Sequence, residues 1–124
     1  MKPVRSPDDR RAALQRGADA EDHVAELLEK QGWDVVSRNW RGGGGELDIV
    51  VARPGALRFV EVKARSAHDL HGPEVAVGPR KRRRLVRAAE AYLAAVDTPY
   101  DEVAFLVALV EGERVTLIDD AFDA

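Results

Sequence analysis

Two strand-like runs around a Pro-Gly turn constrain the fold of this chain more than any other segment. The first is ELDIVVA, residues 46–52, and the second is LRFVEVKA, residues 57–64. Both contain many of the β-branched and aromatic residues that strands favour, and only the tetrapeptide RPGA, residues 53–56, separates them. The sequence therefore predicts an antiparallel β-hairpin.

Both strands of this hairpin carry charge where an apolar residue would be the ordinary choice. Alternate residues of a strand share a face, so Glu61 and Lys63 lie on one face of the second strand. Asp48 shares a face of the first strand with Val50 and lies opposite Leu47 and Ile49. A symmetric turn of two or four residues places Asp48 directly across from Glu61.

Two acids in this arrangement need a compensating positive charge. Directly opposed residues have Cβ atoms about 4.5–5.5 Å apart, and like charges at that separation are destabilising. A divalent cation compensates them, because Mg²⁺ is commonly held by one or two carboxylates together with water and substrate phosphates. Lys63 then lies one side chain away, where it can orient a water molecule or neutralise charge on a phosphorus centre. An ordinary cross-strand ion pair on a solvated face is the alternative.

An acid also lies on the apolar stripe of the predicted first helix. This helix begins with Ser6 as its cap, continues to about residue 31 and ends at Gly32. Its inward positions include Glu21 beside Val24 and Leu28. A buried acid needs a partner or a metal, so Glu21 is a candidate for the same site. The alternative is an edge position from which Glu21 reaches solvent or an arginine.

The remaining segments complete an α/β order of α-β-β-β-α-β-β. The nearly all-apolar run EVAFLVALV predicts a strand buried on both faces in the middle of a sheet. The glycines of residues 41–45 predict a loop, in which the backbone bends sharply, approaches a ligand closely or is merely flexible. We expect residues 1–7 and 66–78 to be mobile. The other predicted elements are a strand at residues 33–40, a helix at about residues 79–96, and strands at residues 102–110 and 114–118.

Length and composition indicate one cytoplasmic domain, residues 1–124. Without cysteine the chain forms no disulfide and no thiolate metal site. No apolar run approaches the roughly 20 residues of a membrane span. A metal site at His68 and His71 has too few other ligands nearby to be the favoured interpretation.

The net charge of −3 argues against a uniformly basic nucleic-acid-binding protein, but positive charge is concentrated locally. The segment PRKRRRLVR, residues 79–87, holds six basic residues. Lys81 shares the buried register of this helix and could reach toward the acids or cover the edge of the core. A solvated helix face is the alternative to phosphate contact, which would position a duplex without selecting a base sequence. The candidate phosphate-binding residues are Arg80, Lys81, Arg83, Arg84 and Arg87.

An Asp, a hairpin and a Glu-x-Lys, behind a helix with an inward Glu, form the ordered pattern of the PD-(D/E)xK nucleases. The segments GGELDIV, FVEVKAR, GPEVAVGPRKRRRLVRAAEAYL and YDEVAFLV resemble the YraN family of small bacterial predicted endonucleases. The likeness extends from about Gly17 to Phe122. It implies a restriction-endonuclease-like fold, with a central mixed β-sheet flanked by helices, similar also to archaeal Holliday-junction resolvases.

The resemblance also implies roles for individual residues. Asp48 and Glu61 would be metal-binding carboxylates, and the carbonyl of Val62 would be a further ligand. Lys63 would be the catalytic lysine. Glu21 would complete the catalytic set and is an additional candidate metal ligand.

The function that follows is Mg²⁺- or Mn²⁺-dependent hydrolysis of phosphodiester bonds in DNA, with branched or structured DNA as a candidate substrate. DNA is favoured over RNA, and junction-cutting relatives suggest a homodimer. Ala64 departs from the family pattern, which often has Thr after the lysine, so any hydroxyl contact at that position is lost. The alternative is a non-catalytic nucleic-acid-binding or protein-interaction module that retains the nuclease fold.

Overall fold

The computed structural model describes residues 7–65, 78–97 and 99–119, without the side chains of residues 7–18 and 65. Its elements follow the predicted order α-β-β-β-α-β-β. Their bounds are α1 Pro7–Lys30, β1 Asp34–Gly42, β2 Gly45–Arg53, β3 Ala56–Arg65, α2 Pro79–Ala95, β4 Glu102–Glu111 and β5 Arg114–Asp119.

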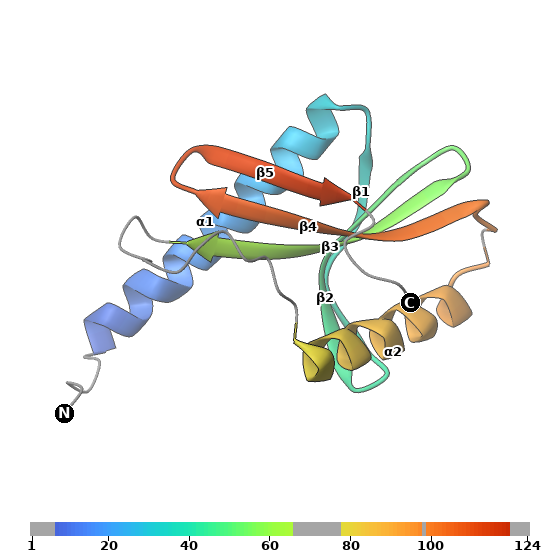
Figure 1. Cartoon of the computed structure of the whole chain (residues 1–124), viewed down its shortest axis with the longest axis horizontal. Coiled ribbons are helices and arrows are strands. Elements are labelled where there is room, and N and C mark those ends of the chain that lie inside the picture. The colour runs from blue at the N-terminus through green and yellow to red at the C-terminus, as the bar shows by residue number, and fades with distance from the viewer. Residues whose placement is uncertain (1–6, 66–77, 98, 120–124) are drawn as a thin grey trace.

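The five strands form one mixed sheet in the order β1-β2-β3-β4-β5 (Figure 1). All neighbouring strands are antiparallel except β3 and β4, which are parallel. Parallel neighbours need a crossover connection, and α2 lies in the connection between these two strands. The α/β fold with a mixed sheet and two helices confirms the predicted class and is consistent with a restriction-endonuclease-like fold.

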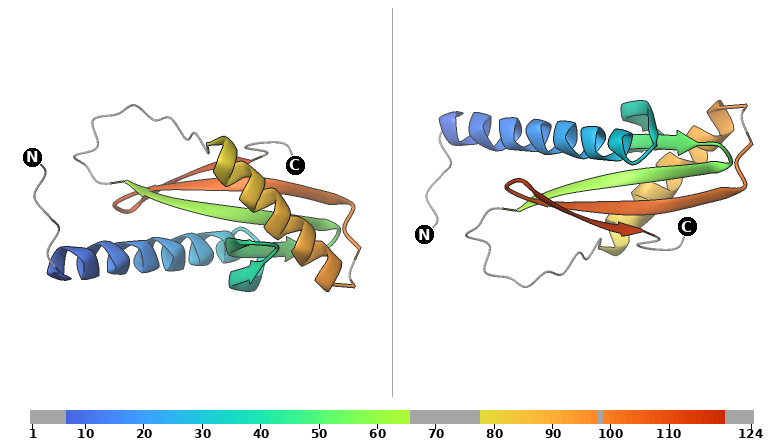
Figure 2. Two further views of the ribbon diagram at one scale, coloured as in Figure 1. Left: turned by 90° about the horizontal axis from the view of Figure 1, so that it is seen from below. Right: turned by 90° about the horizontal axis from the view of Figure 1, so that it is seen from above.

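Two separate apolar cores lie on the two faces of the sheet. On one face α1 packs Val24 and Leu28 against the central strands, and Figure 2 shows this helix running along the sheet. On the other face α2 contributes its predicted stripe, which includes Leu85 and Tyr92. Tyr92 meets Phe59 edge-on, with ring centroids 5.7 Å apart. The sheet is therefore covered on both faces, as the apolar run in β4 predicts.

Strand β4 confirms that prediction, because it lies between β3 and β5 and every residue from Phe105 to Val110 is buried. Helix α1 also ends as predicted, since Gly32 follows it with a φ of 95° that favours glycine. Among the described residues, no helix combines the length and the apolar character needed to cross a membrane.

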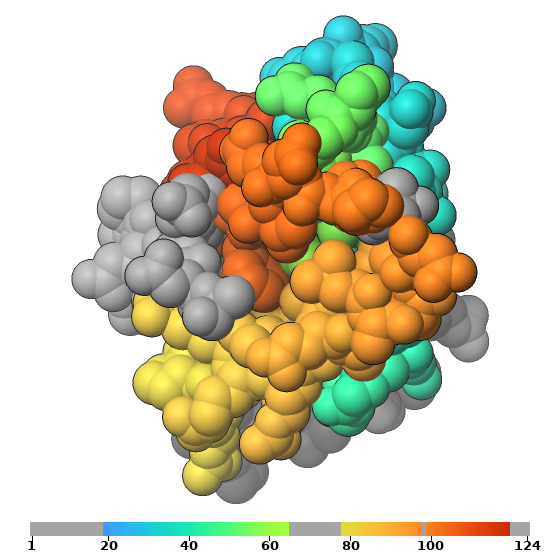
Figure 3. All heavy atoms as spheres, turned by 90° about the vertical axis from the view of Figure 1, so that its right-hand side faces the viewer, coloured from blue at the N-terminus to red at the C-terminus, as the bar shows by residue number. Residues whose placement is uncertain are grey.

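The predicted loop at residues 41–45 is wrong, because these residues form a tight hairpin between β1 and β2. Gly42 pairs with Gly45, and Gly43 and Gly44 between them have φ values of 62° and 84°. The hairpin packs closely against α2 (Figure 3). A Cβ atom on Gly45 would lie 2.6 Å from the backbone oxygen of Arg84. The glycines thus permit a sharp bend, and the backbone that they approach is that of a helix.

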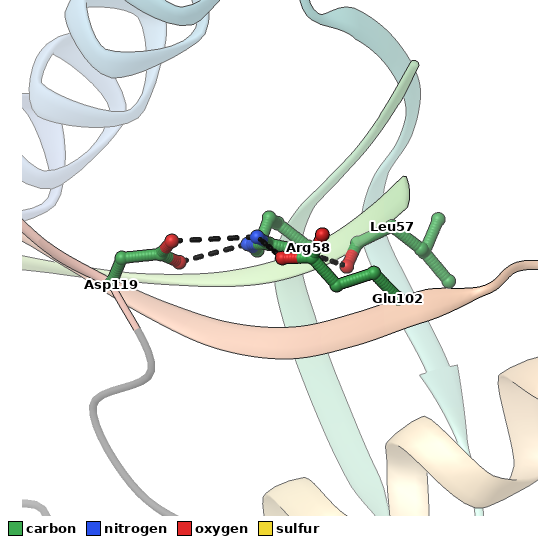
Figure 4. Close-up of polar contacts among 4 residues, drawn as sticks. All are labelled: Leu57, Arg58, Glu102 and Asp119. Carbon is green, nitrogen blue, oxygen red and sulfur yellow. Dashed lines mark hydrogen bonds and ion pairs between the residues drawn. The ribbon is translucent and has the colours of Figure 1, made fainter. Parts of the chain in front are cut away.

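A buried arginine lies on the α1 side of the sheet, away from α2 (Figure 4). Arg58 is 4% exposed, and its Nε donates to Oδ1 of Asp119 at 2.8 Å. Its guanidinium also pairs with Glu102 and donates to the Leu57 carbonyl at 3.1 Å. The guanidinium therefore connects the end of β5 and the start of β4 to β3.

Some predictions fall outside the described residues. These are the expected mobile segments, apart from Pro7 at the start of α1 and Gly78 before α2, together with His68, His71 and Phe122. Mobility in these segments remains a prediction.

Candidate functional site

The candidate site lies where β2 and β3 separate. The two strands pair from Arg53 with Ala56 to Ile49 with Val60, which is the predicted register. Beyond this point β2 remains paired with β1 and turns away from β3 (Figure 1). Asp48 and Glu61 follow the last of these pairs, so the two acids face each other at the mouth of the opening.

Where β2 and β3 separate, the side chain of Asp48 accepts a hydrogen bond from the β3 backbone in place of a backbone carbonyl of β2. The backbone N–H of Val62 donates to Oδ2 of Asp48 at 2.9 Å. Strict alternation fails here, because Leu47 and Val50 belong to the same core although opposite faces were predicted for them. On β1, Asn39 lies between Arg38 and Trp40, which pair with Ile49 and Leu47, and its φ of 50° interrupts the regular pleat.

Glu61 is a buried acid with one acidic and one basic neighbour. Its side chain is 7% exposed, and the Lys81 ammonium pairs with its Oε1 from the first turn of α2. Burial, followed by the charge of Asp48, raises the pKa of Glu61 to about 7, although Lys81 acts in the opposite direction. Ionisation of both carboxyl groups at once is therefore unfavourable when no cation is bound between them.

A cavity of about 710 Å³ opens beside this acidic pair. Its walls are the β1–β2 hairpin on one side and α2 on the other, with a cation on each wall. Arg41 belongs to the hairpin, while Lys81 and Arg84 belong to the helix. The lining residues are Arg41, Gly42, Gly44, Gly45, Glu46, Asp48, Glu61, Lys81, Arg84 and Leu85.

Glu21 approaches this site from α1 without lining the cavity. Its side chain is 21% exposed. Burial, with a further contribution from the charge of Asp48, raises the pKa of Glu21. Arg38 Nη2 lies 3.9 Å from Glu21 Oε2 and 2.7 Å from Oδ1 of Asp22. Glu21 therefore has the arginine partner of the alternative prediction, and the charge of Asp48 also acts on it. A role for Glu21 in a metal site stays a prediction.

Lys63 is half-buried on β3, two residues beyond Glu61, and does not line the cavity. Between them Val62 directs its N–H toward β2 and Asp48. The N–H and C=O groups of one strand residue point to the same side, so the Val62 carbonyl also faces the opening.

The oxygen atoms at this point suit a hard divalent cation. Asp48 and Glu61 supply two carboxylates and Val62 supplies a carbonyl, with room in the cavity for water and a phosphate. The mutual repulsion of the two acids is the charge pattern that a cation relieves. Within the described ranges, no three His, Cys, Asp or Glu residues are grouped closely enough to hold a metal ion. The candidate ligands at the opening are therefore two acids and a carbonyl, and Glu21 as a further ligand stays a prediction.

The predicted phosphate-binding residues of α2 are all exposed. Lys81 and Arg84 line the cavity, while Arg80, Arg83 and Arg87 do not. Sequence reasoning missed Arg41, because the hairpin that carries it was expected to be a loop. The position of Arg41 directly before the glycines was the available signal.

Comparison with known proteins gives one family and many similar sequences. Residues 20–118 match the model of "Uncharacterised protein family UPF0102". A UPF0102 protein of Nitratidesulfovibrio vulgaris is 46% identical over 120 residues, which cover 94% of this chain and 87% of the relative. A UPF0102 protein of Acidiphilium cryptum is 47% identical, covering 93% and 89%. One from Dechloromonas aromatica is 41% identical, covering 88% and 89%.

Proposed function

Because the chain belongs to the uncharacterised protein family UPF0102, we propose its function from its own site: it is a divalent-cation-dependent endonuclease that hydrolyses phosphodiester bonds in DNA. Membership of this family confirms the resemblance to the YraN family, since the two are the same family. The observation that carries the proposal is the pair of half-buried Asp48 and buried Glu61, which opens into a cavity with cations on both walls.

Each group at the site has a role in this reaction. Asp48, Glu61 and the Val62 carbonyl would hold Mg²⁺ or Mn²⁺. When bound, the cation would stabilise charge on the phosphoryl oxygens and lower the pKa of an attacking water. Lys63 orients that water and neutralises developing charge with its ammonium group. Glu21 lies close enough for the charge of Asp48 to act on it, and its own negative charge would strengthen the attraction of the site for a cation.

The cavity walls support a nucleic-acid substrate. Arg84 and Lys81 on α2, and Arg41 on the opposite hairpin, place positive charge on either side of the acidic pair. Such cations bind phosphates without reading base edges, so recognition depends on the shape of the DNA. Branched or structured DNA is the favoured substrate class, with RNA less favoured. A homodimer would bring two such sites to one junction, and the protein would act in the cytoplasm.

A cleavage panel tests the proposal. The wild type and Lys63→Ala are incubated with a four-way junction, a flap, duplex DNA, single-stranded DNA and single-stranded RNA, in Mg²⁺, Mn²⁺ or EDTA. The wild type should cut at least one DNA substrate only when a divalent cation is present. Lys63→Ala should not cut it, with an unchanged circular dichroism spectrum. Equal cleavage by the variant, or no cleavage of any substrate by the wild type, would contradict the proposal.

The ion pair between Lys81 and Glu61 favours a second candidate, a non-catalytic nucleic-acid-binding or protein-interaction module. In such a module Lys81 alone compensates the acids. Calorimetric titration separates the two candidates, because a purely structural cluster should bind neither Mg²⁺ nor Mn²⁺. The module would retain DNA or protein binding without cleavage.

A further inference from the structure

Lys81 lies at an unusual place for a helix-surface lysine. It belongs to the first turn of α2, and 52% of its side chain is exposed. Its ammonium nevertheless pairs with Oε1 of Glu61, whose side chain is only 7% exposed. The lysine therefore reaches from solvent to the wall of the cavity, where its positive charge meets a buried acid.

This contact uses the carboxylate that a divalent cation would also need. Glu61, Lys81 and Asp48 all line the cavity, and both Asp48 and Lys81 act on the Glu61 carboxyl group. Mg²⁺ coordinates carboxylate oxygens at about 2.0–2.1 Å and demands near-octahedral geometry. An ammonium paired with the same carboxylate would face a doubly charged ion at short range, and the two cations repel each other.

We propose that Lys81 and a divalent cation compete for Glu61, so that binding of the cation displaces the lysine into the cavity. This inference rests on the proposed function and describes how the same site is regulated. Without the cation, the Lys81 ammonium compensates the negative charge of Glu61 and reduces the repulsion between Glu61 and Asp48. With the cation, the freed ammonium stands beside Arg84 at the wall that a substrate phosphate would meet. The lysine thus becomes available to the phosphate only when the cation is in place.

Arg84 provides a matched control for Lys81. Both residues are exposed, both line the cavity and each carries one positive charge. Among the ion pairs of the described residues, Glu61 pairs with Lys81 and not with Arg84. Comparing Lys81→Gln with Arg84→Gln therefore separates loss of the contact from loss of nearby positive charge.

The first measurement is calorimetric titration of the wild type and both variants with Mn²⁺ at pH 8. Lys81→Gln should bind Mn²⁺ about tenfold more tightly than the wild type, a size typical of coupling between linked events. Arg84→Gln should differ from the wild type by less than about threefold. Equal affinities in Lys81→Gln and Arg84→Gln would overturn the inference while leaving the proposed function intact. No Mn²⁺ binding in any of the three proteins would overturn both.

The second measurement uses thermal unfolding of the same proteins, and it does not depend on activity. In EDTA, Lys81→Gln should melt about 4 °C below Arg84→Gln, because Glu61 loses the partner of its buried charge. In saturating Mn²⁺ the two melting temperatures should agree, since the cation then compensates Glu61. A gap that Mn²⁺ leaves unchanged would mean that Lys81 has a structural role only and would overturn the competition.

Discussion

Replacing Glu61 with a glutamine should remove a pH-dependent loss of stability from the cation-free protein. Glu61 is buried beside Asp48, and these two causes raise its pKa from 4.5 to about 7. The folded protein therefore binds the proton of the Glu61 carboxyl group more tightly than the unfolded chain does. The resulting stabilisation is complete below pH 4.5 and is lost as the pH rises through about 7.

The size of the effect follows from the same shift. Each pKa unit corresponds to about 1.4 kcal/mol, so the shift amounts to about 3 kcal/mol of unfolding free energy. The glutamine side chain in Glu61→Gln has the same shape and cannot ionise, which makes its contribution independent of pH. The free energy of unfolding of the wild type, minus that of Glu61→Gln, should therefore fall by about 3 kcal/mol between pH 4.5 and pH 8.

Urea unfolding in EDTA at several pH values measures this difference, because the midpoint and slope give the free energy directly. Glu46→Gln is the control, since Glu46 lines the same cavity but is exposed. Its stability curve should remain parallel to that of the wild type. A stability curve of Glu61→Gln that also runs parallel to that of the wild type would refute the reasoning. It would mean that ionising Glu61 does not lower the free energy of unfolding of the cation-free protein.

Three further outcomes are expected. Gly45→Ala should destabilise the fold by about 1–3 kcal/mol in urea unfolding, because the added Cβ meets the Arg84 carbonyl; Gly78→Ala meets nothing within 4 Å and should cost less, since it loses only the preference for glycine at the N-cap of α2, and an equal loss in both would contradict the packing of the hairpin on α2. Arg58→Met should lower the free energy of unfolding less than Arg58→Ala in urea unfolding, because Met keeps more of the packing volume; in either variant the two acids left behind are 65% and 57% exposed and stay hydrated. Equal losses would show that the ion pairs outweigh the packing. Mn²⁺ at about 100 times its dissociation constant should stabilise the wild type by about 2.7 kcal/mol, measured as a thermal shift that EDTA reverses; a shift of the same size in Asp48→Asn would place the ion elsewhere.

Patterns within single segments of the sequence predict most of the fold and the pairing of the two acids. The turn at residues 53–56 and the period-two alternation place Asp48 opposite Glu61, and the register confirms this prediction. Within β2 the alternation fails at Asp48, next to the position on β1 where Asn39 interrupts the pleat. That break depends on a partner strand, which periodicity within one segment does not describe.

The features that the sequence did not predict depend on contacts between segments far apart in the chain. The glycines of residues 41–45 signalled a close approach, but the backbone that they meet belongs to a helix much later in the chain. Arg58 is buried because acids from β4 and β5 reach it, and its own strand contains no sign of them. Likewise the helical register of Lys81 allowed contact with the acids, but only the packing of α2 on the sheet selects Glu61 as its partner.

The central claim is that Asp48 belongs to a metal-dependent nuclease site, and the rate of DNA cleavage by Asp48→Asn tests it most directly. The variant keeps an acceptor oxygen for the Val62 N–H, so the local hydrogen bond can persist while the charge is removed. In Mn²⁺, on the substrate that the wild type cuts fastest, the rate should fall by at least about 100-fold. A rate equal to that of the wild type would contradict the account.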